Sequence, residues 1–123
     1  MQHGFNAYAS AARANQSVVS PRELEASLLI KAAVRLQAIS DDWSLADRDL
    51  DDALNYNRKL WTLLVSAVVA EDNLLPIGIK TNILSLANFI FNQTFRISAS
   101  PAPEGLRVLV GINRDIAAGL RNR

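Results

Sequence analysis

The sequence of 123 residues contains no cysteine, one histidine and only five glycines. Without cysteine the chain has no disulfide, no thiolate nucleophile and no cysteine-ligated metal site. The single histidine, His3, lies in a segment without a strong apolar stripe, whereas a catalytic base needs a fixed geometry. The scattered glycines form neither a dinucleotide-binding nor a P-loop pattern. We therefore expect no enzyme and no cofactor.

The chain also has little net charge and no long uninterrupted apolar run. A formal net charge of +1 argues against a strongly electrostatic nucleic-acid binder. The longest candidate membrane span, between Lys80 and Arg96, has 15 residues, and several amide side chains interrupt it. A bilayer needs about 18 or more apolar residues. Because the N-terminus also lacks the basic and apolar regions of a signal peptide, we expect a cytoplasmic protein without membrane contact.

Half of the residues are hydrophobic, and they recur at helical spacing. Helices are expected from Pro21 to about Asp41, from Ser44 to the break at Glu71, from Pro76 to the loop at Ser98, and from Glu104 onward. No segment alternates as a β-hairpin does. The sequence thus predicts an all-α fold, a small up-down bundle of about four main helices. We expect residues 1–19 to form an N-terminal arm or short helix and residues 20–123 a single α-helical domain.

Local signals refine these helices. Ser20, Pro21 and Glu23 have the spacing of an N-cap, a first-turn proline and a capping box. Ser44 is the expected N-cap of the second helix. In the fourth helix Gly111 and Gly119 are costly residues, and we interpret them as points of close helix–helix approach.

Six aspartates lie between positions 41 and 52. A calcium-binding loop needs a glycine where Asp52 stands, and Leu50 belongs to the apolar stripe of the second helix. We therefore interpret the aspartates as charges that stabilise the positive end of a helix dipole. The sequence predicts no metal site.

The third predicted helix has an unusual polar side. Its apolar face is wide, because Leu84, Ala87, Phe91 and Phe95 extend the stripe of Ile79, Ile83, Leu86 and Ile90. The opposite face carries Thr81, Ser85, Asn88 and Asn92, which are polar but uncharged. An exposed helix face ordinarily carries charges. The helix is therefore either enclosed on most sides or meets a partner, and pairing with a second copy to form a homo-oligomer is one option.

Arginine outnumbers lysine ten to three, and Arg107, Arg114 and Arg121 share one face of the fourth predicted helix at a spacing of seven. Such a face suits phosphate recognition. It also suits plain solvent exposure, with Arg121 and Arg123 near the negative end of the helix dipole. We favour solvent exposure, because the chain as a whole is nearly neutral.

Several blocks of sequence, in order and over nearly the whole chain, resemble the FlaF family of bacterial flagellar biosynthesis regulators. The specific blocks are Asn57-Arg58-Lys59-Leu60-Trp61-Thr62 and Ile112-Asn113-Arg114-Asp115-Ile116-x-x-Gly119-Leu120. Weaker support comes from Ala7-Tyr8, from Ser20-Pro21-Arg22-Glu23-Leu24-Glu25 and from Asn73-x-Leu75-Pro76.

The resemblance implies a small helical cytoplasmic protein that acts with flagellin before export, as a chaperone-like secretion factor. It also implies work alongside FlbT, a regulator that controls translation of flagellin mRNA. A helical domain with an exposed apolar groove suits this role, since the terminal segments of flagellin form amphipathic helices. The alternative is an RNA-binding translational regulator of flagellin mRNA, based on the arginine face.

Physical reasoning supplies the candidate partner-binding residues. They are two aromatic residues outside the regular stripes, two amides of the neutral face and two arginines of the family-like blocks: Tyr8, Trp43, Asn88, Asn92, Arg58 and Arg114. Trp61 lies on an apolar stripe and is assigned to the core.

Overall fold

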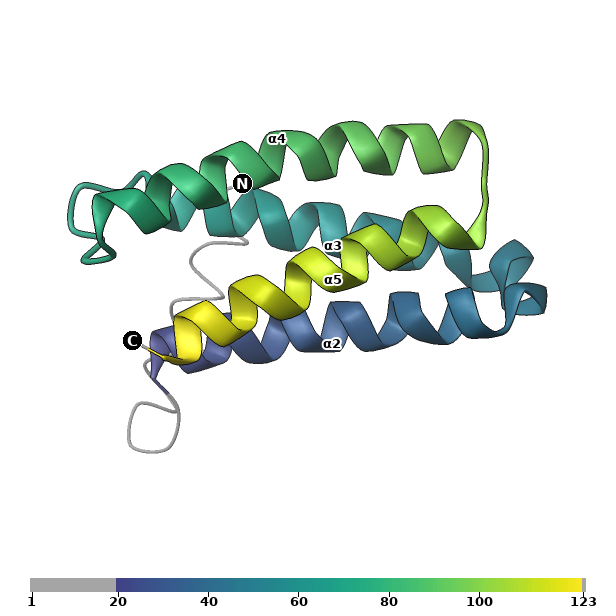
Figure 1. Ribbon diagram of the computed structural model, residues 1–123, viewed down its shortest axis with the longest axis horizontal. Helices are drawn as coiled ribbons and strands as arrows, with labels where there is room; N and C mark the ends of the chain where they lie inside the picture. The colour runs from purple at the N-terminus through teal and green to yellow at the C-terminus, as the bar shows by residue number, and fades with distance from the viewer. Residues whose placement is uncertain (1–19, 123) are drawn as a thin grey trace.

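The computed structural model describes residues 20–122, and these form four α-helices. The helices are α2 (Pro21–Asp41), α3 (Ala46–Val68), α4 (Ile77–Ala99) and α5 (Pro103–Arg121), with a 3-10 turn, η1 (Trp43–Leu45), before α3. Successive helices run in opposite directions (Figure 1). The predicted all-α bundle is confirmed, since this part of the chain has no strand. The prediction of an arm at residues 1–19 lies outside the described residues.

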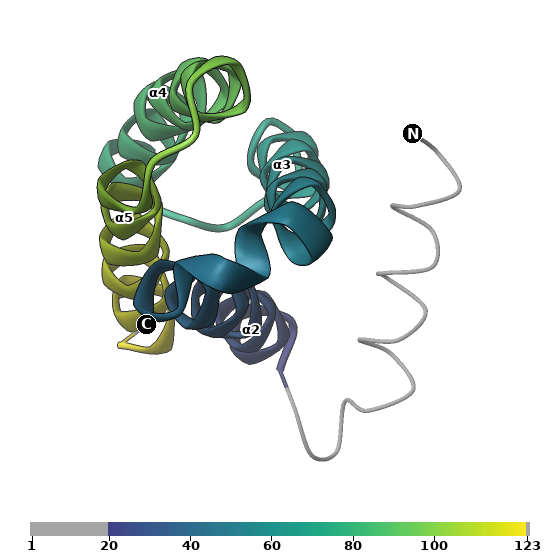
Figure 2. The ribbon, with the colours of Figure 1, turned by 90° about the vertical axis from the view of Figure 1, so that its right-hand side faces the viewer.

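The four helices form a square in which each lies beside its neighbours in sequence (Figure 2). The ring is closed by α5, which packs along α2 in the most extensive helix pair. Because α5 runs obliquely, it begins beside the end of α4 and finishes beside the start of α2 (Figure 1). The α4 helix packs on α3 and on α5, so its outer side faces away from the bundle.

The start of α2 is capped as the sequence predicts, but only half of the capping box forms. The Ser20 hydroxyl accepts a hydrogen bond from the backbone N–H of Glu23 at 3.1 Å. The Glu23 carboxylate instead accepts hydrogen bonds from the Ser27 hydroxyl at 3.0 Å and from the Arg121 guanidinium at 2.8 Å. These contacts join the first turn of α2 to the last turn of α5. The hydrogen bonds from Arg121 and Ser27 hold the pKa of Glu23 below its ordinary value.

Ser44 is not the N-cap of the second helix, which is a correction to the sequence prediction. The Asp42 carboxylate accepts the backbone N–H of Ser44 at 3.2 Å and its hydroxyl at 2.6 Å. This contact starts the turn η1, which leads into α3 without a side-chain cap. Asp47 and Asp49 lie in the first turn of α3, where their charge favours the positive end of the helix dipole.

A single asparagine organises the connection between α3 and α4. The Asn73 side chain donates to the backbone oxygen of Ala67 at 2.9 Å and accepts the backbone N–H of Leu75 at 2.9 Å. The backbone oxygen of Asn73 accepts a hydrogen bond from the Lys80 ammonium at 2.7 Å. The end of α3 and the first turns of α4 are therefore tied to the same residue, and Leu75 is buried between them.

The core contains a hydrogen-bonded network of three fully buried polar side chains. The Trp61 indole N–H donates to the Asn113 side-chain oxygen at 2.9 Å. The Asn113 amide nitrogen donates to the Asn57 side-chain oxygen at 2.7 Å and to the backbone oxygen of Leu29 at 3.2 Å. The network thus joins α2, α3 and α5. The amide nitrogen of Asn57 has no acceptor.

This network predicts a large effect of Asn113 on stability. Asn113→Leu leaves the indole N–H of Trp61 and the side-chain oxygen of Asn57 buried without partners. Each such group costs about 1–3 kcal/mol, so we expect the free energy of unfolding in urea to fall by about 2–5 kcal/mol. The same change at exposed Asn82 should shift it by less than about 0.5 kcal/mol. Equal losses at the two positions would contradict a stabilising role of the network.

The glycines of α5 do not mark close helix contacts where the sequence suggested. A Cβ atom added at Gly111 or Gly119 would meet no atom within 4 Å, and both residues are exposed. The close approach occurs at Gly105, where a Cβ would lie 2.9 Å from Cγ1 of Ile97 on α4. The expectation failed because both glycines lie on the outer side of α5.

Gly111→Ala and Gly119→Ala should therefore each stabilise the protein. Alanine has the higher helix propensity, and the open space removes any steric cost, so we expect a gain of about 0.5–1 kcal/mol per site. Gly105→Ala is the matched variant and should lower stability, because its Cβ crowds Ile97. Thermal or urea unfolding measures all three, and a loss at Gly111 or Gly119 would contradict the open environment.

Candidate functional site

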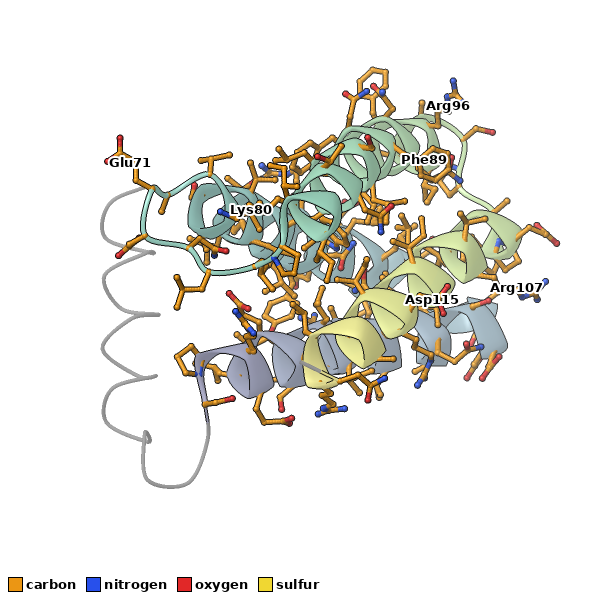
Figure 3. All side chains as sticks on the ribbon, turned by 60° about the vertical axis from the view of Figure 1, so that its left-hand side comes forward. Glu71, Lys80, Phe89, Arg96, Arg107 and Asp115 are labelled. Carbon is orange, nitrogen blue, oxygen red and sulfur yellow. The ribbon has the colours of Figure 1, made fainter. Side chains whose placement is uncertain are left out.

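The outer side of α4 is a long exposed surface without charge. From Thr81 to Phe95 the helix has no charged residue. Eight residues in this stretch are exposed, and we call them the α4 neutral face: Thr81, Asn82, Leu84, Ser85, Asn88, Phe89, Asn92 and Phe95. Figure 3 shows Lys80 and Arg96 toward the two ends of α4 and Phe89 on the side facing α5.

Two large residues assigned to the wide apolar face are exposed, which corrects the sequence prediction. The buried side of α4 is the narrower stripe of Ile83, Ala87, Ile90, Thr94 and Ile97. In contrast, Phe95 is 76% exposed and Leu84 is 38% exposed. The physical reason is that α4 has neighbours on one side only. Of the two earlier interpretations, enclosure within residues 20–122 is therefore wrong, and contact with a partner stays a proposal.

A groove of about 480 Å³ lies between α3 and α4, beside the neutral face. Its walls include Arg58 of α3 and the two phenylalanines Phe91 and Phe95 of α4. Arg58 is exposed, and its guanidinium has no ion-pair partner within residues 20–122. The structure thus brings Arg58 close to the helix that carries Asn88 and Asn92. These are three of the six candidate residues from the sequence.

The other candidates are not part of this surface. Trp43 lies in η1, where it is half-buried and packs against the hydrophobic core. Arg114 is exposed on α5, a helix away from the groove. Tyr8 lies outside the described residues. Trp61, which the sequence assigned to the core, has no exposed surface.

One of the three arginines on the arginine face of α5 forms an ion pair within the bundle. Arg121 forms the ion pair with Glu23 at 2.8 Å, so it is not a free cation. Its hydrogen bond to Glu23 raises the pKa of Arg121 above the ordinary value. Arg107 and Arg114 remain exposed, and Figure 3 shows Arg107 pointing away from the bundle.

A larger cavity of about 740 Å³ lies between the start of α2, the α3–α4 connection and the end of α5. Its polar wall contains Glu23 and Arg121, which already pair with each other. Its rim contains Ser20, the first residue that the structure describes, so we assign no site there. Across residues 20–122 no group of three metal-ligating side chains converges, and no helix has the length and apolar character to cross a bilayer.

Comparison with known proteins identifies the family. A family model described as flagellar protein FlaF matches residues 5–120. This chain belongs to the FlaF family. Searches of curated proteins and of solved structures found no match.

The structure explains several residues of the FlaF-like blocks by their roles in folding. Asn57, Trp61 and Asn113 form the buried network, and Asn73 holds the α3–α4 connection. Arg58 directly follows Asn57, and Arg114 directly follows Asn113, but both arginines are exposed. Burial thus separates the blocks into residues that stabilise the bundle and residues that are exposed on its surface.

Sequence reasoning missed two exposed aromatic residues of α4. Phe95 was assigned to the wide apolar face, and Phe89 was given no role. The available signal was the absence of charge from Thr81 to Phe95, which is unusual for a helix with solvent on one side.

Exposure of Phe95 predicts tolerance to substitution. Phe95→Ser should change the free energy of unfolding by less than about 0.5 kcal/mol, because the side chain buries little surface. Ile90→Ala on the buried stripe of the same helix should cost about 2–4 kcal/mol. Urea denaturation of both variants measures the difference. A loss of more than about 2 kcal/mol at Phe95 would show that its side chain is packed.

Proposed function

We propose that this FlaF-family chain binds monomeric flagellin in the cytoplasm as an export chaperone and helps to couple flagellin translation to secretion. The α4 neutral face carries the proposal. It combines exposed aromatic residues with amide and hydroxyl side chains and contains no charge. Depletion of charge and enrichment of aromatic residues are typical of the central part of a protein interface.

The shape of this surface suits a helical ligand. From Thr81 to Phe95 the helix α4 spans about 21 Å, which equals about four turns. An amphipathic helix of similar length can lie along it with apolar anchors at positions i, i+3, i+4 and i+7. The terminal segments of flagellin form such helices in the filament, and their apolar stripes need cover before export.

Cover of these segments also prevents early polymerisation of flagellin. A segment that orders on binding loses conformational entropy, which lowers its affinity for a given buried area. Moderate affinity agrees with a chaperone that must release its ligand for secretion. The proposal needs neither an enzymatic step nor a cofactor, since all contacts are binding contacts.

In this proposal the coupling to translation depends on FlbT as a further protein partner. Direct RNA binding is the alternative, and two exposed arginines of α5, Arg107 and Arg114, are its basis. The third residue of that face, Arg121, is engaged by Glu23. RNA affinity that falls steeply with salt would support the alternative.

Isothermal titration of the full chain with monomeric flagellin tests the proposal. We expect binding to full-length flagellin and none to flagellin without its terminal segments. Asn88→Asp should weaken binding by about tenfold, because it places a carboxylate without a partner in the uncharged interface. Asn122→Asp is the matched control on the opposite part of the molecule and should bind as the wild type does.

Absence of binding to either form of flagellin would overturn the proposal. Binding that persists after removal of both terminal segments would contradict the helix-covering role. Equal affinities of the Asn88→Asp variant and the wild type would exclude the α4 neutral face as the binding surface. Helical circular dichroism of each variant verifies its fold.

A further inference from the structure

The groove between α3 and α4 contains two charged side chains, Asp51 and Arg58, and both belong to α3. Both are exposed, and within residues 20–122 neither forms an ion pair. They are separated by two helical turns, or about 10 Å along the axis, so they project from the same side but cannot pair with each other. The groove therefore presents a carboxylate and a guanidinium that both lack partners.

This charge pattern is complementary to itself. In a two-fold symmetric contact, residue i of one copy faces residue j of the other, and j faces i. When two α3 helices lie antiparallel about an axis midway between the two charges, each Asp51 faces Arg58 of the second copy. Both unpaired charges of both copies are then neutralised at once.

The most exposed aromatic side chain of the described residues lies at the level of that axis. Since α3 and α4 are antiparallel, the stretch from Asp51 to Arg58 lies beside the stretch from Phe91 to Ser98. The midpoints of the two stretches are close to Asn55 and Phe95. Phe95 is 76% exposed, so a two-fold contact brings two Phe95 rings together and removes them from water. The Asn55 amide both donates and accepts, so it can pair with its own copy across the axis.

We propose that the α3–α4 groove is the interface of a symmetric homodimer, with two Asp51–Arg58 ion pairs on either side of a central pair of Phe95 rings. A second copy is the favoured occupant because it carries the matching charges at the required spacing. This inference goes beyond the proposed function, since it concerns self-association and requires no flagellin.

Sedimentation equilibrium of the full chain, at concentrations from about 1 to 300 µM, tests the dimer. We expect a monomer–dimer equilibrium that added salt weakens, because exposed ion pairs are screened. Arg58→Asp and Asp51→Arg should each weaken dimerisation at least tenfold, because each places like charges opposite one another. Lys59→Asp makes the same charge change one residue away, outside the groove lining, and should dimerise as the wild type does.

Mixing the variants gives a sharper test. The Arg58→Asp chain is negative at both positions and the Asp51→Arg chain is positive at both, so an equimolar mixture should form heterodimers. The double variant that carries both exchanges should regain the homodimer. A purely structural effect of either substitution predicts neither recovery.

A wild type that stays monomeric over the whole concentration range would overturn the proposal. Single variants that dimerise as the wild type does, or a mixture that stays monomeric, would also overturn it. Should a charge variant fail to fold by circular dichroism, Phe95→Ser provides a second test, and we expect it to weaken the dimer. Flagellin binding by a chain that shows no dimer would overturn this inference alone and leave the proposed function intact.

Discussion

The hydrogen-bond network of Trp61, Asn113 and Asn57 is the interaction on which the rest of the structure depends. It joins α2, α3 and α5 through side chains that have no contact with water. Apolar packing alone tolerates shifts between helices, whereas a buried amide must meet its partners within hydrogen-bond distance. The network therefore fixes the register of three helices against one another. The ion pair between Glu23 and Arg121 supports the same arrangement at the surface.

The fourth helix, α4, does not take part in this network. Its buried stripe consists of apolar residues and Thr94, whose hydroxyl donates to the backbone oxygen of Ile90 in the same helix. The network thus holds α2, α3 and α5 together. The helix α4 packs against α3 and against the first part of α5. A helix held from one side is free to present its other side to a partner, so the position of α4 in the bundle makes its neutral face available.

The helical spacing of apolar residues, together with the residues that cap or break helices, predicts most of the fold. Local sequence is sufficient to predict three features: the cap at Ser20, the break before Pro76 and the four apolar stripes. Ser44 was misread because the Asp42 carboxylate, two residues earlier, accepts its N–H and hydroxyl and starts the turn η1. The helical glycines were misread because close approach depends on neighbours far along the chain. The exposure of Phe95 was missed for the same reason, since periodicity shows which residues share a face but not how many helices cover it. The exposed positions of Arg58, Asn88 and Asn92 were predictable, because the helical period places a charge or an amide on the polar side of its helix.

Several residues in the blocks that resemble the FlaF family therefore have roles in folding. Asn57, Trp61, Asn73 and Asn113 hold the bundle together, and the α4 neutral face lies between blocks rather than within them. Binding of a helix requires shape, apolar surface and absence of charge, which many combinations of residues supply. A buried hydrogen-bond network, in contrast, accepts few combinations of side chains. The fold is accordingly easier to predict from this sequence than the proposed binding surface is.

Ionic strength separates the two contacts proposed for α4. An uncharged interface gains its free energy from apolar burial, which salt changes little or strengthens. The paired Asp51 and Arg58 of a dimer are weakened by salt. Since Phe95 belongs both to the neutral face and to the dimer axis, the two contacts compete for one side chain. Under the two proposals, binding of one ligand lowers the apparent affinity for the other, so we expect flagellin to displace the second copy and higher salt to favour that displacement.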